Sequence, residues 1–142
     1  MEIGKGLSMK IIENIKNLFR WKKIEVIPND LENALEMLMS SVPSEDKERF
    51  AKRPKNKAVA QCHFGGGMNM RNNWKLWEKE SNLSMWFRNR GVWHPDDMSA
   101  IIFKAFWCKL NGIYFDIDIE AEYYAEYWKR EGIGFDGEKI NK

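Results

Sequence analysis

The stretch from Pro95 to Leu110 places large apolar side chains on almost every side of a helix. Pro95 at the first helical position, with Asp96 and Asp97 in the first turn, is typical of a helix start, and Asn111-Gly112 is typical of a helix end. The apolar residues between these signals keep to no single stripe: Met98, Ile101, Ile102, Phe103, Ala105, Phe106, Trp107 and Leu110. A helix that is apolar all round has to be surrounded by other elements. The sequence therefore predicts a domain built around this helix, at about 95–110.

Shorter helical patterns precede and follow the central one. Each is bounded by capping residues, proline or glycine. We predict a first helix that begins at Asn29-Asp30 and ends at Val42-Pro43, and a second that is capped by Ser44 and ends at Pro54. Three further helices are predicted: one from Lys57 to Phe64, one that is capped by Asn82 and ends at Gly91, and one from about Asp118 to Glu131. Residues Asn69 to Trp77 have mixed character with at least one helical turn, and Ile113 to Ile117 is extended without a partner strand.

These patterns predict an all-α fold, a compact single domain of five to seven helices spanning residues 1–142. Residues 1–28 form an N-terminal amphipathic helix and linker, 29–132 the core, and 133–142 a polar, frayed tail. The amphipathic helix covers Met9 to Trp21, and we expect it to dock on the domain's own core rather than on an anionic membrane surface.

Composition narrows the class of protein further. A chain of 142 residues can bury a proper core, and its apolar runs are far shorter than the ~20 residues that span a bilayer. Cys62 and Cys108 lie 46 positions apart without the spacing of a zinc or redox motif. With no secretory signal at the start, we expect a soluble, cytoplasmic protein without a cofactor.

The first candidate motif is the run from His63 to Asn72, His-Phe-Gly-Gly-Gly-Met-Asn-Met-Arg-Asn. The three glycines, Gly65, Gly66 and Gly67, can adopt positive φ and expose backbone N–H groups to an anion. A helix end with a tight turn is the alternative. The run is no Walker loop, because no Gly-Lys-Ser/Thr follows it. His63 could interact with the helix dipole as a cation, donate to a phosphate, or act as a general base.

The second motif is His94-Pro-Asp-Asp-Met-Ser99. Its two aspartates suit helix initiation, although they could also form an acid/base pair or join His94, His63 and Cys62 around zinc. That ligand set lacks any known spacing, so we predict no metal site. Arg71 of the first motif either pairs internally with Asp96 or Asp97, or binds an anionic ligand with its planar fork.

Tryptophans and positive charge gather in the same region. Trp74 and Trp77, three residues apart, would share a helical face and could stack on a planar ring, and Trp86 and Trp93 follow closely. Residues 44–95 hold eleven Lys and Arg against five Asp and Glu, a local charge of +6, whereas residues 96–142 hold six against ten, a local charge of −4. This field favours anionic partners, but a nucleic-acid binder would show a more basic domain or a known motif.

The two motifs together resemble an uncharacterised family of small bacterial and phage-encoded proteins, a domain of unknown function. The pattern is His63-x-Gly65-x-Gly67-x-x-x-Arg71-Asn72-x-Trp74-x-Leu76-Trp77 followed by His94-Pro95-Asp96-Asp97-x-Ser99, and the similarity covers roughly Leu31 to Leu110. The resemblance implies a helical domain with the two motifs close together, and a bacterial or mobile-element source. Two departures stand out: Lys75 takes the place of a glycine before Leu-Trp, and Glu78-Lys79-Glu80 is more charged than the pattern.

The leading functional hypothesis is a small non-enzymatic binding module for an anionic ligand of nucleotide-like character. The residues expected to bind it are His63, Gly65, Gly66, Gly67, Arg71, Asn72, Trp74, Trp77, His94 and Asp97. The alternative is a protein-interaction factor (an immunity, antitoxin or anti-defence protein) that blocks a partner through a basic surface at Lys52, Arg53, Lys55 and Lys57. A third hypothesis is a small hydrolase that uses His63 or His94 with Asp97. The sequence leaves homodimer formation open.

Overall fold

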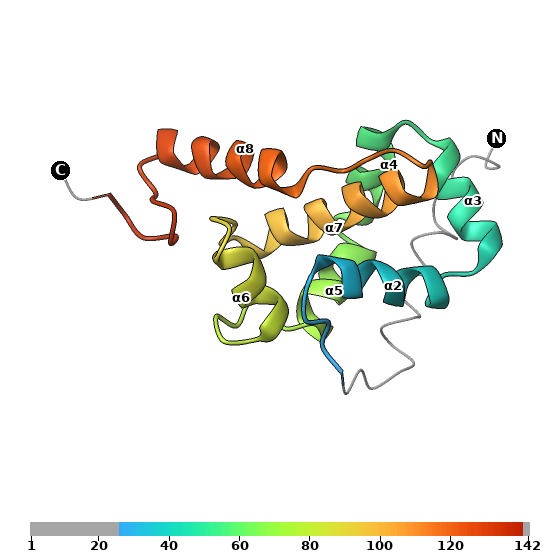
Figure 1. Cartoon of the computed structure of the whole chain (residues 1–142), viewed down its shortest axis with the longest axis horizontal. Coiled ribbons are helices and arrows are strands. Elements are labelled where there is room, and N and C mark those ends of the chain that lie inside the picture. Colours follow the sequence, from blue (N-terminus) through green and yellow to red (C-terminus); the bar gives the residue numbers. More distant parts are fainter. Residues whose placement is uncertain (1–25, 141–142) are drawn as a thin grey trace.

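Helix α7 (Pro95–Leu110) runs through the middle of the molecule, as its apolar sequence predicts (Figure 1). The computed structural model describes residues 26–140, and this part of the chain folds into seven helices without a strand. The other six all pack on α7: α2 (Leu31–Ser41), α3 (Ser44–Lys52), α4 (Lys55–Cys62), α5 (Gly66–Asn73), α6 (Asn82–Arg88) and α8 (Ile117–Arg130). The predicted all-α class and the number of helices are therefore confirmed. The predicted helix at Met9 to Trp21 lies outside the described residues.

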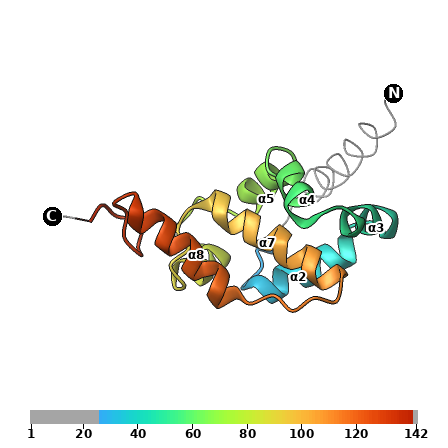
Figure 2. The ribbon, with the colours of Figure 1, turned by 90° about the horizontal axis from the view of Figure 1, so that it is seen from above.

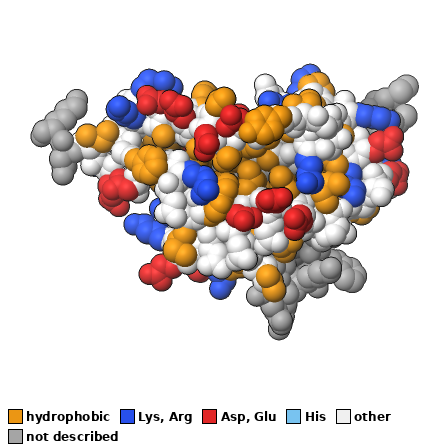
Figure 3. All heavy atoms as spheres, in the orientation of Figure 1, with side chains coloured by type: hydrophobic (Ala, Val, Ile, Leu, Met, Phe, Trp, Pro, Cys, Tyr) orange, Lys and Arg blue, Asp and Glu red, His pale blue; other side chains and the backbone are white. Residues whose placement is uncertain are grey.

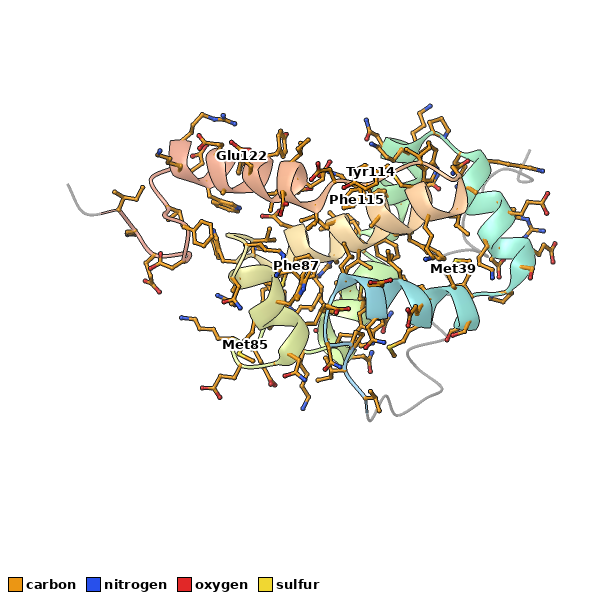
Figure 4. All side chains as sticks on the ribbon, viewed as in Figure 1. Met39, Met85, Phe87, Tyr114, Phe115 and Glu122 are labelled. Carbon is orange, nitrogen blue, oxygen red and sulfur yellow. The ribbon has the colours of Figure 1, made fainter. Side chains whose placement is uncertain are left out.

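The core forms where aromatic and aliphatic side chains of the surrounding helices meet α7. Phe50 of α3 lies between two rings of α7, with centroids 6.4 Å from Phe103 and 5.7 Å from Phe106. Phe87 reaches from α6 toward α7 and is fully buried (Figure 4). Burying each such ring contributes about 1.5–3 kcal/mol. Contacts of this kind explain why short helices with weak propensities of their own are stable here.

Side chains or backbone at the helix starts satisfy the first N–H groups. Asp30 caps α2 by accepting from the backbone N–H of Asn33 at 2.8 Å. Two predicted caps are displaced by one residue: Pro43 and Ser81 occupy the N-cap positions of α3 and α6, and the predicted caps Ser44 and Asn82 are the first helical residues. The reason is that the carbonyl groups of Pro43 and Ser81 already accept the first helical hydrogen bonds.

Four helices end with the same backbone turn, in which one residue takes the left-handed conformation. Glycine occupies that position after α6, α7 and α8, at Gly91, Gly112 and Gly132. After α5 the position belongs to Lys75, with φ of 53°. There the N–H of Leu76 donates to the carbonyl of Arg71 at 2.9 Å, the six-to-one bond of a Schellman motif. Lys75, where the resemblance led us to expect glycine, thus stands where the backbone favours glycine.

The glycine run does not end a helix by positive φ, as the sequence suggested. Gly66 and Gly67 are the first residues of α5, Gly65 has φ of −81°, and none of the three is left-handed. Trp74 and Trp77 do not share a helical face either, because α5 ends at Asn73. Trp74 is 1% exposed in the core, whereas Trp77 is 56% exposed on the following turns.

Residues 133–140 are not a frayed tail. They form a turn in which Ile133 and Lys139 make an antiparallel bridge, and the N–H of Gly134 donates to the carbonyl of Glu138 at 2.7 Å. The turn packs against the connection between α6 and α7, so close that a Cβ atom on Gly137 would come within 2.8 Å of the Trp93 ring. The chain beyond α8 therefore turns toward the connection between α6 and α7 (Figure 1).

None of the helices within residues 26–140 combines the length and the apolar character needed to cross a bilayer.

Replacing Lys75 with glycine should raise the free energy of unfolding by about 0.5–1 kcal/mol, because the left-handed conformation costs a residue with a Cβ atom more than it costs glycine. Lys75→Ala keeps the Cβ atom and should change stability by less than about 0.5 kcal/mol, since the side chain is exposed. Urea denaturation measures both. Equal stability of the two variants would contradict the strained turn.

Candidate functional site

Arg71 joins the two sequence motifs inside the protein. Its side chain is buried, with the residue 4% exposed, and Nε lies 3.3 Å from Oδ1 of Asp96. Nη1 donates to Oγ of Ser99 at 2.8 Å, and Nη2 donates to the backbone carbonyl of His63 at 3.0 Å. From α5, one guanidinium therefore links the end of α4 to the first turns of α7. Of the two alternatives that the sequence left open for Arg71, the structure contains the internal pair.

The residues around Arg71 provide acceptors and space for its buried guanidinium. Ser99 accepts from Arg71 and donates to the carbonyl of Asp96 at 3.0 Å. Burial lowers the pKa of Arg71, and the Asp96 carboxylate opposes that shift. Gly67 has no room for a side chain, because a Cβ atom there would lie 2.8 Å from the carbonyl oxygen of Cys62 and 2.9 Å from Nη1 of Arg71. This glycine permits the close approach of α4 and the guanidinium.

His94 stands at the start of α7 within a cluster of tryptophans. Its Nδ1 accepts the backbone N–H of Asp96 at 3.0 Å, so the ring is the N-cap of α7. The His94 ring stacks on Trp128 of α8, with centroids 5.7 Å apart and planes 11° apart. It also makes T-shaped contacts with Trp77 and Trp93, at centroid distances of 6.0 and 5.4 Å. Because Nδ1 accepts a hydrogen bond from the helix backbone, Nε2 is the ring nitrogen that remains for other contacts.

Asp97 is hydrogen-bonded to a tryptophan of the same cluster. Its Oδ2 accepts from Nε1 of Trp128 at 2.8 Å. Burial raises the pKa of Asp97, and the hydrogen bond from Trp128 and the nearby His94 and Lys104 oppose that shift. The carboxylate therefore holds α8 against α7.

A pocket of about 260 Å³ opens beside this cluster, and we call it the tryptophan pocket. Its walls include Trp77, Arg88, Trp93, His94, Asp136 and Glu138. Lys79 also lines it and lies 3.7 Å from the Glu138 carboxylate. Asp136 accepts the backbone N–H of Glu138 through Oδ1 at 3.0 Å, which fixes the turn that closes one side. Elements far apart in the sequence thus share one hollow lined by aromatic rings and charged side chains.

Arg88 lines this pocket although the sequence did not single it out as a site residue, and the same holds for Lys79, Asp136 and Glu138. Nε of Arg88 donates to Oγ of Ser84 at 3.1 Å, and within residues 26–140 no carboxylate lies at ion-pair distance from it. Burial alone lowers the pKa of Arg88. The only sequence signal was its share in the positive charge of residues 44–95, because an arginine in a last helical turn ordinarily interacts with the helix dipole.

The remaining predicted site residues lie elsewhere. His63 lines a second hollow of about 390 Å³ between α4 and α7, together with Phe64, Ser99 and Phe103, and this hollow is mostly apolar. Asn72 is exposed on α5, and Trp74 is packed in the core. The structure therefore brings the two motifs together through Arg71 but distributes their side chains over two hollows and the core.

The described residues hold no group of three or more His, Cys, Asp or Glu side chains that could bind a metal ion. Cys62 and Cys108 are both free and buried. Burial raises the pKa of the Cys62 thiol to about 12, so this thiol is not poised as a nucleophile.

Together the seven helices define an all-α protein organised around one buried helix. Its sequence belongs to the family described as Domain of unknown function (DUF6794), which matches residues 27–110. The match covers α2 to α7 and both motifs, whereas α8 and the turn at residues 133–140 lie beyond it. No curated protein and no solved structure matches the chain.

Arg71→Gln should lower the free energy of unfolding by about 2–3 kcal/mol, because it removes a buried charge that three groups on two helices depend on. Arg88→Gln is the matched control and should cost less than about 1 kcal/mol, since Arg88 has one hydrogen bond to lose. Chemical denaturation at pH 7 compares them. Equal losses would show that Arg71 does not hold the motifs together.

Asp97→Asn should not destabilise the protein at pH 7 and should raise its free energy of unfolding by less than about 1 kcal/mol, because the amide oxygen can still accept from Trp128 while the buried charge is gone. Asp97→Ala lacks that acceptor and should cost about 1–2 kcal/mol.

The pH dependence follows from the raised pKa. The folded state binds a proton on Asp97 more tightly than the unfolded chain does, so stability from this group falls as pH rises from about 4 through the folded pKa. The advantage of Asp97→Asn should therefore vanish toward pH 4. An advantage that persists there would contradict the assignment.

Proposed function

We propose that this protein is a small non-enzymatic binding module whose ligand combines a planar ring with negative charge, in the manner of a nucleotide, and occupies the tryptophan pocket. The observation that carries the proposal is Arg88, a partly buried guanidinium beside exposed tryptophan surface and without a carboxylate partner in the described part of the chain.

The contrast with Arg71 explains why Arg88 is the better anion site. A buried guanidinium is costly unless it is paired, and Arg71 meets that requirement internally with Asp96, Ser99 and His63. Within residues 26–140, Arg88 forms one hydrogen bond, in which its Nε donates to Oγ of Ser84. Its two terminal nitrogens remain as donors for a carboxylate or phosphate, which guanidinium binds in a bidentate manner.

The rings of the pocket suit the planar part of such a ligand. Trp77 is more than half exposed, and its ring lies 6.0 Å from that of His94, which also lines the pocket. Stacking of a base on an aromatic side chain contributes about 1–3 kcal/mol. The volume of about 260 Å³ fits one ring system better than a whole nucleotide, which leaves the anionic group near Arg88 and Lys79. Asp136, which also lines the pocket, can accept from amino groups of the ring.

The proposal assigns different roles to the residues of the sequence motifs. Trp77 and His94 contact the ligand. Arg71, with Gly67 beside it, holds Asp96 and thus the start of α7, where His94 is the cap. Asp97 supports the pocket through Trp128. His63 and Asn72 stay outside this pocket.

We also retain, as proposals, a bacterial or phage source and a cytoplasmic location. The first rests on the resemblance of the paired motifs, and the second on buried, unpaired cysteines in a chain whose described helices do not suit a membrane.

Titration with the four common ribonucleoside monophosphates, followed by tryptophan fluorescence and calorimetry, tests the function. At least one should bind the unaltered protein. Arg88→Gln should weaken that binding at least ~10-fold through loss of the charge-assisted hydrogen bonds, and Trp77→Ala by ~5-fold to 100-fold through loss of stacking. Lys129→Gln, the same loss of charge on an exposed position of α8, is the control and should leave affinity unchanged.

Native mass spectrometry of protein purified gently from its host complements the titration, because a retained ligand would add its mass to 16.8 kDa. No binding of any of the four compounds, together with no added mass, would contradict a nucleotide-like ligand. Equal binding by the Arg88 and control variants would contradict the placement of the site.

A further inference from the structure

Ile117 and Tyr124 of α8 pack against the core, but the helix carries a second row of large apolar side chains on the side that faces away from the domain. Ile119, Tyr123 and Tyr127 are 65%, 60% and 43% exposed, and their spacing of four residues places them on one face. Figure 1 shows this helix along the upper edge of the molecule, and Figure 2, seen from above, shows it in front, with no other helix of residues 26–140 over it. A surface helix ordinarily turns its apolar stripe inward. We call these three residues the outer stripe.

The inner side of α8 explains why the stripe is not needed for folding. Polar contacts attach this side to α7: Lys104 donates to Tyr124 at 2.9 Å and lies 3.4 Å from Glu120, and Trp128 donates to Asp97. Ala121 is the one fully buried residue of the helix. The helix is therefore anchored without the outer stripe, which is available for a partner.

Opposite charges mark the two ends of the stripe. Asp116, the N-cap of α8, lies seven residues before Tyr123, and Arg130, the last helical residue, lies seven residues after it. Seven residues are close to two helical turns, so both charges lie nearly in line with the stripe. The residues are thus placed symmetrically about Tyr123. Ile119 and Tyr127 lie four residues before and after it, and Asp116 and Arg130 lie seven residues before and after it.

This arrangement is complementary to itself when a second copy is turned by 180°. With Tyr123 on the two-fold axis and the two helices antiparallel, Tyr123 meets Tyr123 of the second copy, Ile119 meets Tyr127, and Asp116 meets Arg130, the last two pairs each twice. Asp116 uses Oδ1 to cap α8, which leaves Oδ2 for the arginine. Glu126 would approach Glu120 of the second copy, but Glu120 already interacts with Lys104.

We infer that the outer stripe of α8 is a dimer interface at which a second copy of this chain docks antiparallel. Tyrosine is favoured at such interfaces because it contributes a large, partly apolar contact area at little entropic cost. Further exposed apolar side chains lie at both ends of the helix, Tyr114 before it and Phe135 after it, and Figure 4 shows Tyr114 just before α8.

The dimer is expected to be a weak one. A helix of 14 residues is about 21 Å long, and one pair of such helices buries less than the ~1,200 Å² of typical stable interfaces. Dissociation constants on the order of 10–100 µM are consistent with that size. Hydrophobic side chains also gather over the middle of the domain, between α8 and α2 (Figure 3), but that surface lacks the two-fold charge pattern.

Cysteine cross-linking of the full chain tests the inference directly, because the native Cys62 and Cys108 are buried. In the antiparallel dimer, a cysteine at position 123 lies on the axis next to its own copy, close enough for a disulfide. Tyr123→Cys should therefore form a covalent dimer under mild oxidation. Lys129→Cys is equally accessible but about 120° away around the helix, and should give at least ~10-fold less dimer.

Sedimentation equilibrium provides a second measurement without cysteine. The unaltered chain should rise from 16.8 kDa toward twice that mass between ~1 and ~200 µM. Arg130→Glu, which faces Asp116 of the second copy with a like charge, should abolish the rise, whereas Lys129→Glu should not, and circular dichroism should show the same helix content for both. Equal cross-linking at positions 123 and 129, or a mass of 16.8 kDa at all concentrations, would overturn the interface and leave the stripe to a different protein.

Discussion

The fold depends on how one buried guanidinium is satisfied. Arg71 cannot lose its charge at any ordinary pH, so the chain has to supply acceptors wherever it is buried. These acceptors come from the carbonyl of His63 at the end of α4 and from Asp96 and Ser99 at the start of α7. The three helices are thereby held in one arrangement. Gly67 is needed for the same reason, because the guanidinium and the end of α4 occupy the space that a side chain at this position would fill.

The polar chemistry of the molecule is concentrated at the N-terminal end of α7, while the rest of that helix is surrounded by apolar side chains. His94, Asp96 and Asp97 each satisfy a backbone or side-chain group there and also shape the surface beside it. The tryptophan pocket is therefore bordered by residues that these contacts hold in place. Part of its wall, at Asp136 and Glu138, comes from the chain beyond the region matched by the family. The pocket of this protein is thus completed by its own C-terminal segment.

Local signals in the sequence predicted most of the elements. Proline and aspartate at the start of α7, and glycine after α6, α7 and α8, act through the backbone of their own turn, so their effect needs no tertiary context. The same reasoning failed at the glycine run. A glycine that permits positive φ and a glycine that makes room for a neighbour look alike in sequence, and Gly67 is of the second kind. The turn at residues 133–140 was missed because it packs against Trp93 and Gly91, which lie far away in the chain.

The residue pattern alone was enough to predict a helical protein with α7 at its centre, because this follows from periodicity. It also identified Arg71 and the aspartates of the second motif as charges that need partners, because burying an unpaired charge is costly. Which charges find partners depended on the three-dimensional arrangement of the helices. This arrangement paired Arg71 with Asp96 and left Arg88 beside a pocket. It also placed Trp74 in the core and Trp77 at the surface, although they are three residues apart. Pairing and burial depend on distances between segments remote in the chain, which no local pattern contains.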